Sequence, residues 1–415
     1  METLTKLQGR KIVVISNLYP PENIGGYEIG ISWISDEIQN QNAKLRIYIP
    51  RRFISFSNLG EKTMFHKHFD QRMHSIGVGW IGHPSLKKSI SLIPSLISTL
   101  IIQQLQIRNI CKFADVVLFA NPRGIPFNFT ERMAKVLNKE EIPYFFYVSD
   151  RWVETWPSSD PLYGLRGKIE KIYIKRQNFY FLQKFLNSVL NKFVSRNEIQ
   201  YLQPTSWVSC SNFIESGIKK RIGKKINSKV LHWRVPFNTN SGNKIRCEHS
   251  GDCVTFASNV TAEKGIFMLL EALSLINRAA HLHIIGDMIE LNKEVSQLNK
   301  GIKLKIVNEG KKSPIEVSEF LSTYKTTLAV PSIWPEPFSI VATQAVVANC
   351  PLVITPTGGS PEWKTLSSKG IVVSKTTSAN DFALALSQVL IAPDLKTRKK
   401  MSNFKEFVEE IFKGL

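Results

Sequence analysis

The sequence predicts an α/β protein of two domains, each built around a parallel sheet. Its 415 residues are too many for one hydrophobic core and fit two domains of ordinary size. In both halves short apolar runs alternate with segments of helical spacing, which is typical of parallel strands joined by crossover helices. No long repeat period recurs along the chain, so a repeat protein is not indicated.

The first half opens as strand, loop, helix and strand. Apolar runs at residues 11–16 and 45–49 predict two strands, with helical spacing between them at residues 29–40. The other elements expected here are strands at 115–120, 143–149 and 207–210 and a helix at 129–137. A basic, turn-rich segment at 219–240 is the predicted linker, so the first domain is predicted to span residues 1–230.

The second half repeats the alternation. Its expected strands are 254–257, 281–285, 302–307, 326–330, 352–354 and 371–373. Its expected helices are 265–276, 313–322, 340–347 and 379–390. The second domain is therefore predicted to span residues 231–395. A terminal helix within residues 396–415 is expected to pack back on the first domain.

Cysteine usage and the N-terminal sequence bear on the compartment. Five cysteines are scattered, odd in number and without metal-ligand spacing, which favours a reduced, cytoplasmic chain without disulfides. No signal-peptide pattern precedes the strand at residue 11. No His, Cys or carboxylate cluster has the spacing of a metal site, so neither a metal nor another cofactor is expected.

A formal charge of +20 favours a polyanion or an anionic membrane face as a partner. Residues 165–196 hold eight Lys and Arg against one acid, with aromatic residues between them, and residues 89–107 carry no charge. Either stretch can lie in an anionic membrane interface or be a core-facing helix with a solvated basic face. Pro94 and the Ser and Gln content argue against a transmembrane span. Since no RNA- or DNA-reading motif is present, a nucleic-acid partner is not expected.

Residues 331–344, PSIWPEPFSIVATQ, are the most informative stretch. They follow an apolar strand and open a helix, so they form a strand-loop-helix corner. Ligands of open α/β sheets bind beyond the carboxyl ends of the strands, and free N–H groups at a helix start bind phosphate. Glu336 precedes that helix start and Gln344 lies one to two turns into it. A carboxylate there can bind sugar hydroxyls, and an amide further along can bind a ribose.

Other loops at expected strand ends carry residues of the same kind. Gly25 and Gly26 follow the first strand, and Gly358 and Gly359 follow the strand after the corner, where glycine lets the backbone approach a ligand closely. The loop of residues 258–265, SNVTAEKG, follows the first strand of the second half. A plain turn or a solvated lysine would explain these residues as well when each is taken alone.

The corner resembles the nucleotide-sugar site of family 4 glycosyltransferases, which are retaining enzymes with the GT-B fold. The family signature is Glu, seven residues and Glu, usually with Pro-Phe-Gly after the first Glu. Here Glu336 is followed by Pro337 and Phe338, whereas Ser339 replaces the Gly and Gln344 the second Glu. The resemblance is specific over residues 254–362 and moderate over residues 11–30. It implies two Rossmann-like domains that face each other across a cleft, with the nucleotide bound mainly by the second.

The resemblance also assigns roles. It implies that Glu336 and Lys264 are catalytic, with Lys264 neutralising charge on the leaving diphosphate. Asp150, after an expected strand of the first half, either accepts a proton from the acceptor hydroxyl or caps the next segment. The residues implied to bind the donor are Gly25, Gly26, Asn259, Gly286, Pro337, Phe338, Ser339, Ile340 and Gln344. Asn259 stands where the family usually has Arg.

The sequence is accordingly interpreted as a retaining glycosyltransferase. It would move a hexose-like unit from a nucleotide diphosphate sugar to a hydroxyl of a glycan or glycolipid, as in cell-surface polysaccharide synthesis. The enzyme would work in the cytoplasm, at the inner membrane face if the acceptor is lipid-linked. Two alternatives stay open: a weak or inactive GT-B scaffold, since Asn259 and Gln344 depart from the family pattern, and a basic protein that binds a membrane surface.

Overall fold

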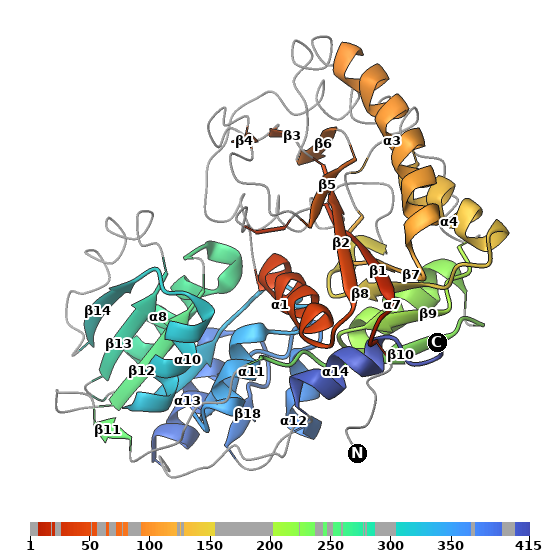
Figure 1. The fold of residues 1–415 in the computed structure, drawn as a ribbon. Helices are drawn as coiled ribbons and strands as arrows, with labels where there is room; N and C mark the ends of the chain where they lie inside the picture. The colour runs from red at the N-terminus through yellow and green to blue at the C-terminus, as the bar shows by residue number, and fades with distance from the viewer. Residues whose placement is uncertain are drawn as a thin grey trace. The chain divides into compact units, whose positions relative to one another are not determined.

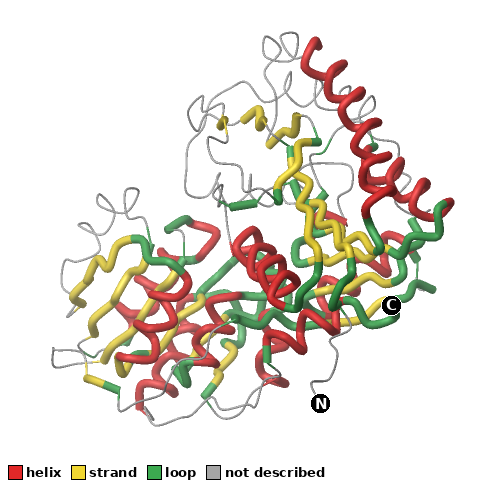
Figure 2. Tube along the Cα trace, viewed as in Figure 1, coloured by secondary structure: helices red, strands yellow, loops and turns green. Residues whose placement is uncertain are grey.

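A computed structural model describes residues 7–17, 19–20, 26–50, 52–55, 64–65, 72–76, 78–81, 93–122, 125, 128–153, 202–223, 225–236, 244–246, 252–258, 260–276, 278, 280–286, 304–366, 370–391 and 403–415. The chain divides into two compact units (Figure 1). The first comprises Met1–Gly164, Lys175–Leu231 and Phe404–Leu415, and the second Leu165–Ile174 and His232–Asn403. Strands and helices alternate along both units (Figure 2).

The first unit contains a seven-stranded parallel sheet. Its strands in spatial order are β5 (Met73–Ser75), β2 (Lys44–Ile49), β1 (Lys11–Ile15), β7 (Val116–Phe119), β8 (Tyr144–Val148), β9 (Ser206–Ser209) and β10 (Ser228–Val230). Counted along the chain, this is the 3-2-1-4-5-6 order of a Rossmann fold with one more strand. The strand order reverses between β1 and β7, where Ile15 pairs with Phe119.

Helices and a small sheet complete the first unit. The helices are α1 (Gly26–Asn40), α3 (Ile93–Phe113), α4 (Phe129–Lys139), α7 (Asn212–Ile222) and α14 (Phe404–Ile411), with a short 3₁₀ turn η1 (Arg151–Val153). The small sheet contains β4 (Met64–Phe65), β3 (Arg52–Ser55) and β6 (Val78–Ile81).

Aromatic side chains on β8 show how the C-terminal residues join the first unit. The Phe146 ring stacks on Phe119 and Trp207 of the neighbouring strands, with centroids 4.8 and 4.4 Å away. Tyr147, which alternates with Phe146, meets Phe407 of α14 edge to face at 6.2 Å. Because successive side chains of a strand lie on opposite faces, α14 covers the face opposite the stack. It also packs against α1.

The second unit has a six-stranded parallel sheet of the same order. Its strands in spatial order are β14 (Leu304–Gly310), β13 (Ala280–Ile285), β12 (Asp252–Ala257), β16 (Thr327–Val330), β17 (Leu352–Ile354) and β18 (Ile371–Val373). A short pair, β11 (Ile245–Arg246) and β15 (Tyr324–Lys325), lies outside this sheet. The order reverses between β12 and β16, and this is where Rossmann-like sheets bind ligands.

Two helix pairs pack with the second sheet. α8 (Ile266–Leu275) and α13 (Ala379–Ile391) contact each other in a core that includes Leu269, Phe382 and Leu386. α10 (Pro314–Thr323) packs against α11 (Ile340–Val347). Ser313 begins α10 with a capping box, in which its hydroxyl accepts from Glu316 N and Glu316 bonds back to Ser313 N. The remaining short elements are η3 (Ala262–Lys264), η4 (Ser360–Glu362) and α12 (Trp363–Leu366).

The predicted α/β architecture with two parallel sheets is confirmed, and α11, β17 and β18 have the predicted bounds. The predicted linker at 219–240 was wrong in part, because α7 extends to Ile222 and β10 begins at Ser228. The expectation of no disulfide was also wrong: Cys253 is disulfide-bonded, while Cys111, Cys210 and Cys350 are free.

No helix in the described part of the chain is both long and apolar enough to cross a membrane. Residues 165–196 lie outside the described part.

Candidate active site at the switch point of the second sheet

Glu336 lies in the loop that connects β16 to α11, at the switch point of the second sheet. Its side chain is mostly buried. The loop ends at Ser339, whose hydroxyl accepts a hydrogen bond from Ala342 N at 3.3 Å and so caps α11. Ile340 is the first residue of the helix. The N–H groups of the first helical turn therefore lie close in the chain to the carboxylate, as the sequence predicted.

Lys264 lies in the loop that follows β12, the other strand at the switch point, and pairs with this carboxylate. It ends η3, after β12, and its Nζ lies 2.5 Å from Glu336 Oε1. The hydroxyl of Ser332 donates to the same oxygen at 3.0 Å. Both partners are partly shielded from water, with 30% of the Lys264 and 12% of the Glu336 side chain exposed. The two residues that the resemblance named as catalytic are thus brought together across 72 residues of sequence.

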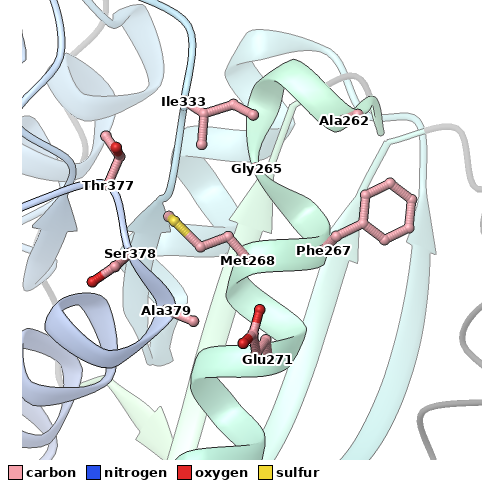
Figure 3. Close-up of a pocket in the computed structure, with 9 residues that line it drawn as sticks. All are labelled: Ala262, Gly265, Phe267, Met268, Glu271, Ile333, Thr377, Ser378 and Ala379. Carbon is pink, nitrogen blue, oxygen red and sulfur yellow. The ribbon is translucent and has the colours of Figure 1, made fainter. Parts of the chain in front are cut away.

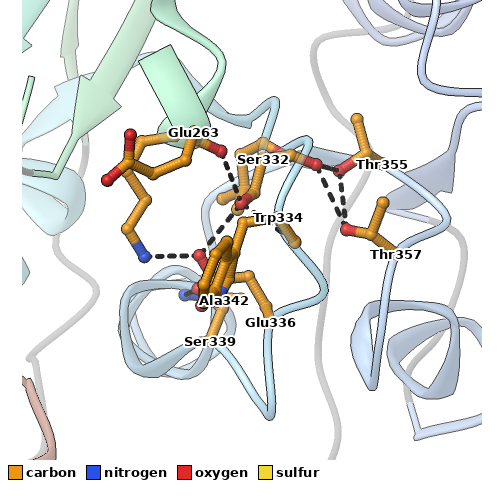
Figure 4. Close-up of polar contacts among 10 residues, drawn as sticks. Glu263, Ser332, Trp334, Glu336, Ser339, Ala342, Thr355 and Thr357 are labelled. Carbon is orange, nitrogen blue, oxygen red and sulfur yellow. Dashed lines mark hydrogen bonds and ion pairs between the residues drawn. The ribbon is translucent and has the colours of Figure 1, made fainter. Parts of the chain in front are cut away.

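Hydrogen bonds join the two loops. Ile333 N and Trp334 N both donate to the Glu263 carbonyl, at 3.1 and 3.2 Å. Ser332 Oγ donates to the same carbonyl at 3.2 Å (Figure 4). The hydroxyls of Thr355 and Thr357 donate to the Ser332 carbonyl at 2.5 and 3.1 Å. Three loops, which follow β12, β16 and β17, consequently hold Glu336 in one position.

Two glycines make this close approach possible. A Cβ on Gly265 would lie 1.9 Å from the Pro331 carbonyl oxygen, and one on Gly358 would lie 2.2 Å from that of Glu336. Both have positive φ, +76° and +58°, which side-chain-bearing residues rarely adopt. Gly359 N then donates to Glu336 O at 2.7 Å. The predicted close-approach loop at Gly358 and Gly359 therefore contacts the backbone of Glu336 itself.

Phe338 anchors the other end of the loop. Its ring stacks on Trp363 with centroids 4.6 Å apart and lies 5.0 Å from the His232 ring. His232 Nε2 is 3.0 Å from Glu362 Oε2. Sequence reasoning missed His232, Glu362 and Trp363, because no local motif indicates a contact between residues 232 and 338.

Gln344 is buried, with its amide nitrogen engaged inside the unit. Nε2 donates to the Pro314 carbonyl at 2.5 Å and to Ser318 Oγ at 3.1 Å, so it connects α11 to α10. No bond of the amide oxygen is seen among the described residues, and this oxygen is the atom that could accept a hydrogen bond from a ribose hydroxyl. A ribose contact of Gln344 stays a prediction.

Gly286 lies at the end of β13 beside the end of β12. A Cβ there would be 2.2 Å from the Ser258 carbonyl oxygen, which is a packing reason for glycine. Asn259, which follows Ser258, lies outside the described residues, and so does Gly25. The donor-binding role of Gly286 stays a prediction.

In the first unit, Gly26 is the first residue of α1 and Asp150 follows β8. Asp150 Oδ1 accepts a hydrogen bond from Arg151 N at 2.6 Å, at the start of η1. This contact reaches only the next residue, so both roles predicted for Asp150, proton acceptor and cap, stay predictions.

A hollow of about 400 Å³ lies beside these loops (Figure 3). It is lined by Ala262 and Gly265, by Ile333, by Met268 of α8 and by the residues that start α13. Lys264, Glu336 and Gln344 are not among its lining residues. No group of three metal-ligating side chains occurs in the part of the chain that the structure describes, and the absence of a metal stays a prediction.

Comparison with known proteins agrees with this geometry. Residues 242–406 match the family described as glycosyl transferases group 1. The matched region includes both switch-point loops, so Lys264 and Glu336 lie within it. Comparison with curated protein sequences gives no match.

Solved structures resemble this protein along nearly its whole length. Sucrose-phosphate synthase from Thermosynechococcus elongatus has a TM-score of 0.58 at 13% identity and covers 97% of this chain and 94% of its own. Anabaena Alr3699/HepE in complex with UDP and glucose has a TM-score of 0.54 at 14% identity, covering 98% and 93%. The lipopolysaccharide outer core galactosyltransferase WaaB has 0.55 at 12%, covering 96% and 93%. These similarities confirm the GT-B fold.

Proposed function

We propose that this protein is a retaining glycosyltransferase that transfers a sugar from a nucleoside diphosphate sugar to a hydroxyl of a glycan or glycolipid. The observation that carries the proposal is the Lys264–Glu336 pair at the switch point of the second sheet, next to the start of α11. This is where a Rossmann-like sheet binds a nucleotide. The complex of Alr3699/HepE with UDP-glucose, a neighbour of the same fold, is consistent with a nucleotide-sugar donor.

The pair suits the charge changes of the reaction. A departing diphosphate gains negative charge, which the ammonium of Lys264 and the N–H groups at the start of α11 can stabilise. The carboxylate of Glu336 is held by Lys264 and Ser332 through Oε1, so Oε2 can accept hydrogen bonds from sugar hydroxyls. Retention of configuration is implied by the resemblance to family 4.

A donor screen tests this function. Thermal shift with UDP-, GDP- and ADP-sugars should identify one nucleotide that raises the melting temperature, because ligand that binds only the folded state stabilises it. That donor should then release nucleoside diphosphate when enzyme is added. Lys264→Met should weaken the shift, whereas substitution of exposed Lys364, on α12, should not. A protein that is stabilised by no donor, or that releases no diphosphate, would contradict the function.

An inactive scaffold is the second candidate, and the buried amide of Gln344 favours it. That amide ties α11 to α10 instead of presenting a charge to the ligand. Such a scaffold would bind the nucleotide without turnover, so the release assay separates the two.

We further propose that the protein works at the inner face of an anionic membrane, and α3 supports this. Leu100, Ile101 and Leu105 are 43%, 59% and 53% exposed on this helix. Arg108 and Lys112 continue the exposed side toward its C-terminus, and α3 contains no acidic residue. An exposed apolar and basic helix side fits the interface of an anionic bilayer, where a lipid-linked acceptor would be found.

A further inference from the structure

His232 is the first residue of the second unit, and the backbone is held on both sides of it. The residue before it, Leu231, belongs to the first unit, where Leu231 N donates to the Ser209 carbonyl at the end of β9 at 2.8 Å. On the other side, the Arg234 guanidinium donates to the carbonyls of His232 and Trp233 at 3.3 and 3.1 Å. The imidazole is therefore attached to a fixed point of the chain.

The side chain of His232 contacts two segments of the second unit. Its Nε2 lies 3.0 Å from Glu362 Oε2, and since a carboxylate only accepts hydrogen bonds, this nitrogen is the donor. Its ring lies 5.0 Å from the Phe338 ring, at an angle of 41°. Only 16% of the His232 and 15% of the Glu362 side chain are exposed. A hydrogen bond to a charged acceptor is stronger than a neutral one, so the imidazole can hold both segments in place.

Both segments support Glu336. Phe338 lies two residues after it in the same loop, and the Phe338 ring stacks on Trp363, the residue after Glu362. Glu362 ends η4, where its N–H donates to the Gly359 carbonyl at 3.1 Å, and Gly359 N donates to the Glu336 carbonyl at 2.7 Å. The imidazole thus contacts the loop of Glu336 on one side and the turn that binds its backbone on the other.

The contacts of His232 bear unequally on the two parts of the candidate site. Lys264 and the start of α11, which are proposed to stabilise the diphosphate, have supports of their own: Lys264 N donates to the Thr261 carbonyl at 3.1 Å, and Ser339 caps α11. Glu336, which is proposed to bind the sugar, is supported from His232 through both segments. Loss of the imidazole should therefore displace this carboxylate more than the diphosphate site. A displacement of about 1 Å in a catalytic arrangement costs on the order of 100-fold in rate.

We propose that His232 is a positioning residue of the transferase, which fixes Glu336 through Phe338 and Glu362 and so governs the transfer step more than nucleotide binding. The proposal rests on the proposed function and adds a residue to its site. The ring of His232 and its hydrogen bond each carry part of the effect, because they act on different segments.

The first test removes the two contacts of His232 separately. His232→Ala removes both, His232→Phe keeps a ring against Phe338, and His232→Gln keeps an N–H donor for Glu362. With the donor that the thermal screen identifies, kcat should fall about tenfold or more in His232→Ala, and less in each of the other two variants. The Kd of the free nucleoside diphosphate, measured by calorimetry, should stay within about threefold of the wild type, because the lost interaction acts in the transfer step.

A residue that serves stability alone gives a different result. Its variants melt at a lower temperature, but the folded enzyme, counted by bound nucleotide, turns over normally well below that temperature. An unchanged kcat in His232→Ala therefore overturns the proposal, and so does a Kd that weakens as much as kcat falls. If His232→Ala does not fold, His232→Gln decides: a kcat about threefold or more below the wild type supports the proposal, and a wild-type kcat overturns it.

A second histidine–glutamate pair of the same unit provides a matched control. His283 Nδ1 lies 3.0 Å from Glu309 Oε1, their side chains are 11% and 20% exposed, and the His283 ring lies 5.6 Å from that of Phe320. These three residues belong to β13, β14 and α10 rather than to the loops that hold Glu336. His283→Ala should lower the melting temperature and leave kcat unchanged. A fall in kcat as large as that of His232→Ala would contradict a specific role of His232.

A double-variant cycle tests the path through Glu362. If the two residues act as a pair, His232→Ala combined with Glu362→Ala should lower kcat by clearly less than the product of the two single losses. A loss equal to that product overturns the coupling.

Release of nucleoside diphosphate by the wild type separates the two failures. If the wild type hydrolyses the donor and the His232 variants do so at the same rate, only the positioning role is wrong. If the wild type neither binds nor hydrolyses any donor, the proposed function fails and the positioning role fails with it.

Discussion

The ammonium of Lys264 lies 2.5 Å from the Glu336 carboxylate, and the two residues follow the neighbouring strands β12 and β16. Because the sheet order reverses between these strands, each residue follows the strand that borders the switch point. The pair is only partly buried, so its contribution to stability is small, on the order of 1 kcal/mol or less. The pair therefore remains available for the proposed binding of a charged ligand.

Glu336→Gln should therefore reduce turnover by orders of magnitude while the protein stays folded. The amide keeps the shape of the side chain but loses the charge that orients Lys264 and the sugar hydroxyls. Loss of one such electrostatic contact in a transition state typically costs about 100- to 1,000-fold in rate. Nucleoside diphosphate release measures turnover, and circular dichroism with thermal melting checks the fold. Sugar transfer at a near-wild-type rate would remove Glu336 from the active site.

Gly358→Ala should destabilise the protein and disturb Glu336. The new Cβ would meet the Glu336 carbonyl oxygen at 2.2 Å, and φ is +58°. Gly310→Ala is a matched control, since its φ of +69° gives similar backbone strain but nothing lies within 4 Å. The strain costs roughly 1–2 kcal/mol in both variants, and overpacking adds about 1–3 kcal/mol in Gly358→Ala alone. Urea unfolding gives the difference, and equal losses of stability in the two variants would contradict the clash.

Gln344→Glu, which restores the residue usual in family 4, should destabilise the second unit. From the sequence alone this change is expected to tighten nucleotide binding through a charge-assisted ribose contact. The structure gives a different expectation, because Nε2 donates to the Pro314 carbonyl and a carboxylate would place an acceptor against an acceptor in a buried site. The loss should be on the order of 3 kcal/mol. Gln344→Met, which removes the hydrogen bonds without adding charge, should lose less. Tighter nucleotide binding at unchanged stability would restore the first expectation.

Glu309 should make the second unit sensitive to acid. Burial alone would raise the pKa of Glu309, but hydrogen bonds from His283 and Lys312 outweigh burial and lower it. A lowered pKa in the folded state gives stability above the ordinary value of about 4.5 that is lost as the pH falls through the folded pKa. Glu309→Gln should therefore be less stable than the wild type at pH 7, and the difference should shrink near pH 4. The exposed Glu319→Gln serves as control, and a difference that does not change with pH would contradict the assignment.

Local signals explain which parts of the site could be predicted from sequence. An apolar strand, the Pro-Glu-Pro-Phe loop and the Ser339 cap are contiguous, so the corner and the bounds of α11 follow from neighbouring residues. The contacts of Phe338 with His232 and of Gln344 with Pro314 join residues 106 and 30 positions apart, and no spacing rule indicates them. Pro94 argued against a spanning helix, yet it is the second residue of α3, where a missing N–H costs no hydrogen bond.

Ile101→Glu combined with Leu105→Glu should abolish docking on anionic membranes. Both side chains are more than half exposed on α3, so their replacement removes apolar contact with lipid without opening the core. Exposed Arg108 and Lys112 on the same helix each contribute on the order of 1 kcal/mol near an anionic surface. Co-sedimentation with vesicles that contain phosphatidylserine should show binding by the wild type that weakens steeply with salt. Leu384→Glu, at a 64% exposed position of α13, controls for the loss of an exposed apolar residue elsewhere.

The basic segment of residues 165–196 is tested independently by changing three of its lysines, Lys168, Lys171 and Lys175, to Glu. If the Ile101 and Leu105 variant still sediments with vesicles while the three-lysine variant does not, the basic segment and not α3 is responsible for membrane binding. If the wild type stays in the supernatant at low salt, the acceptor is expected to be a soluble glycan.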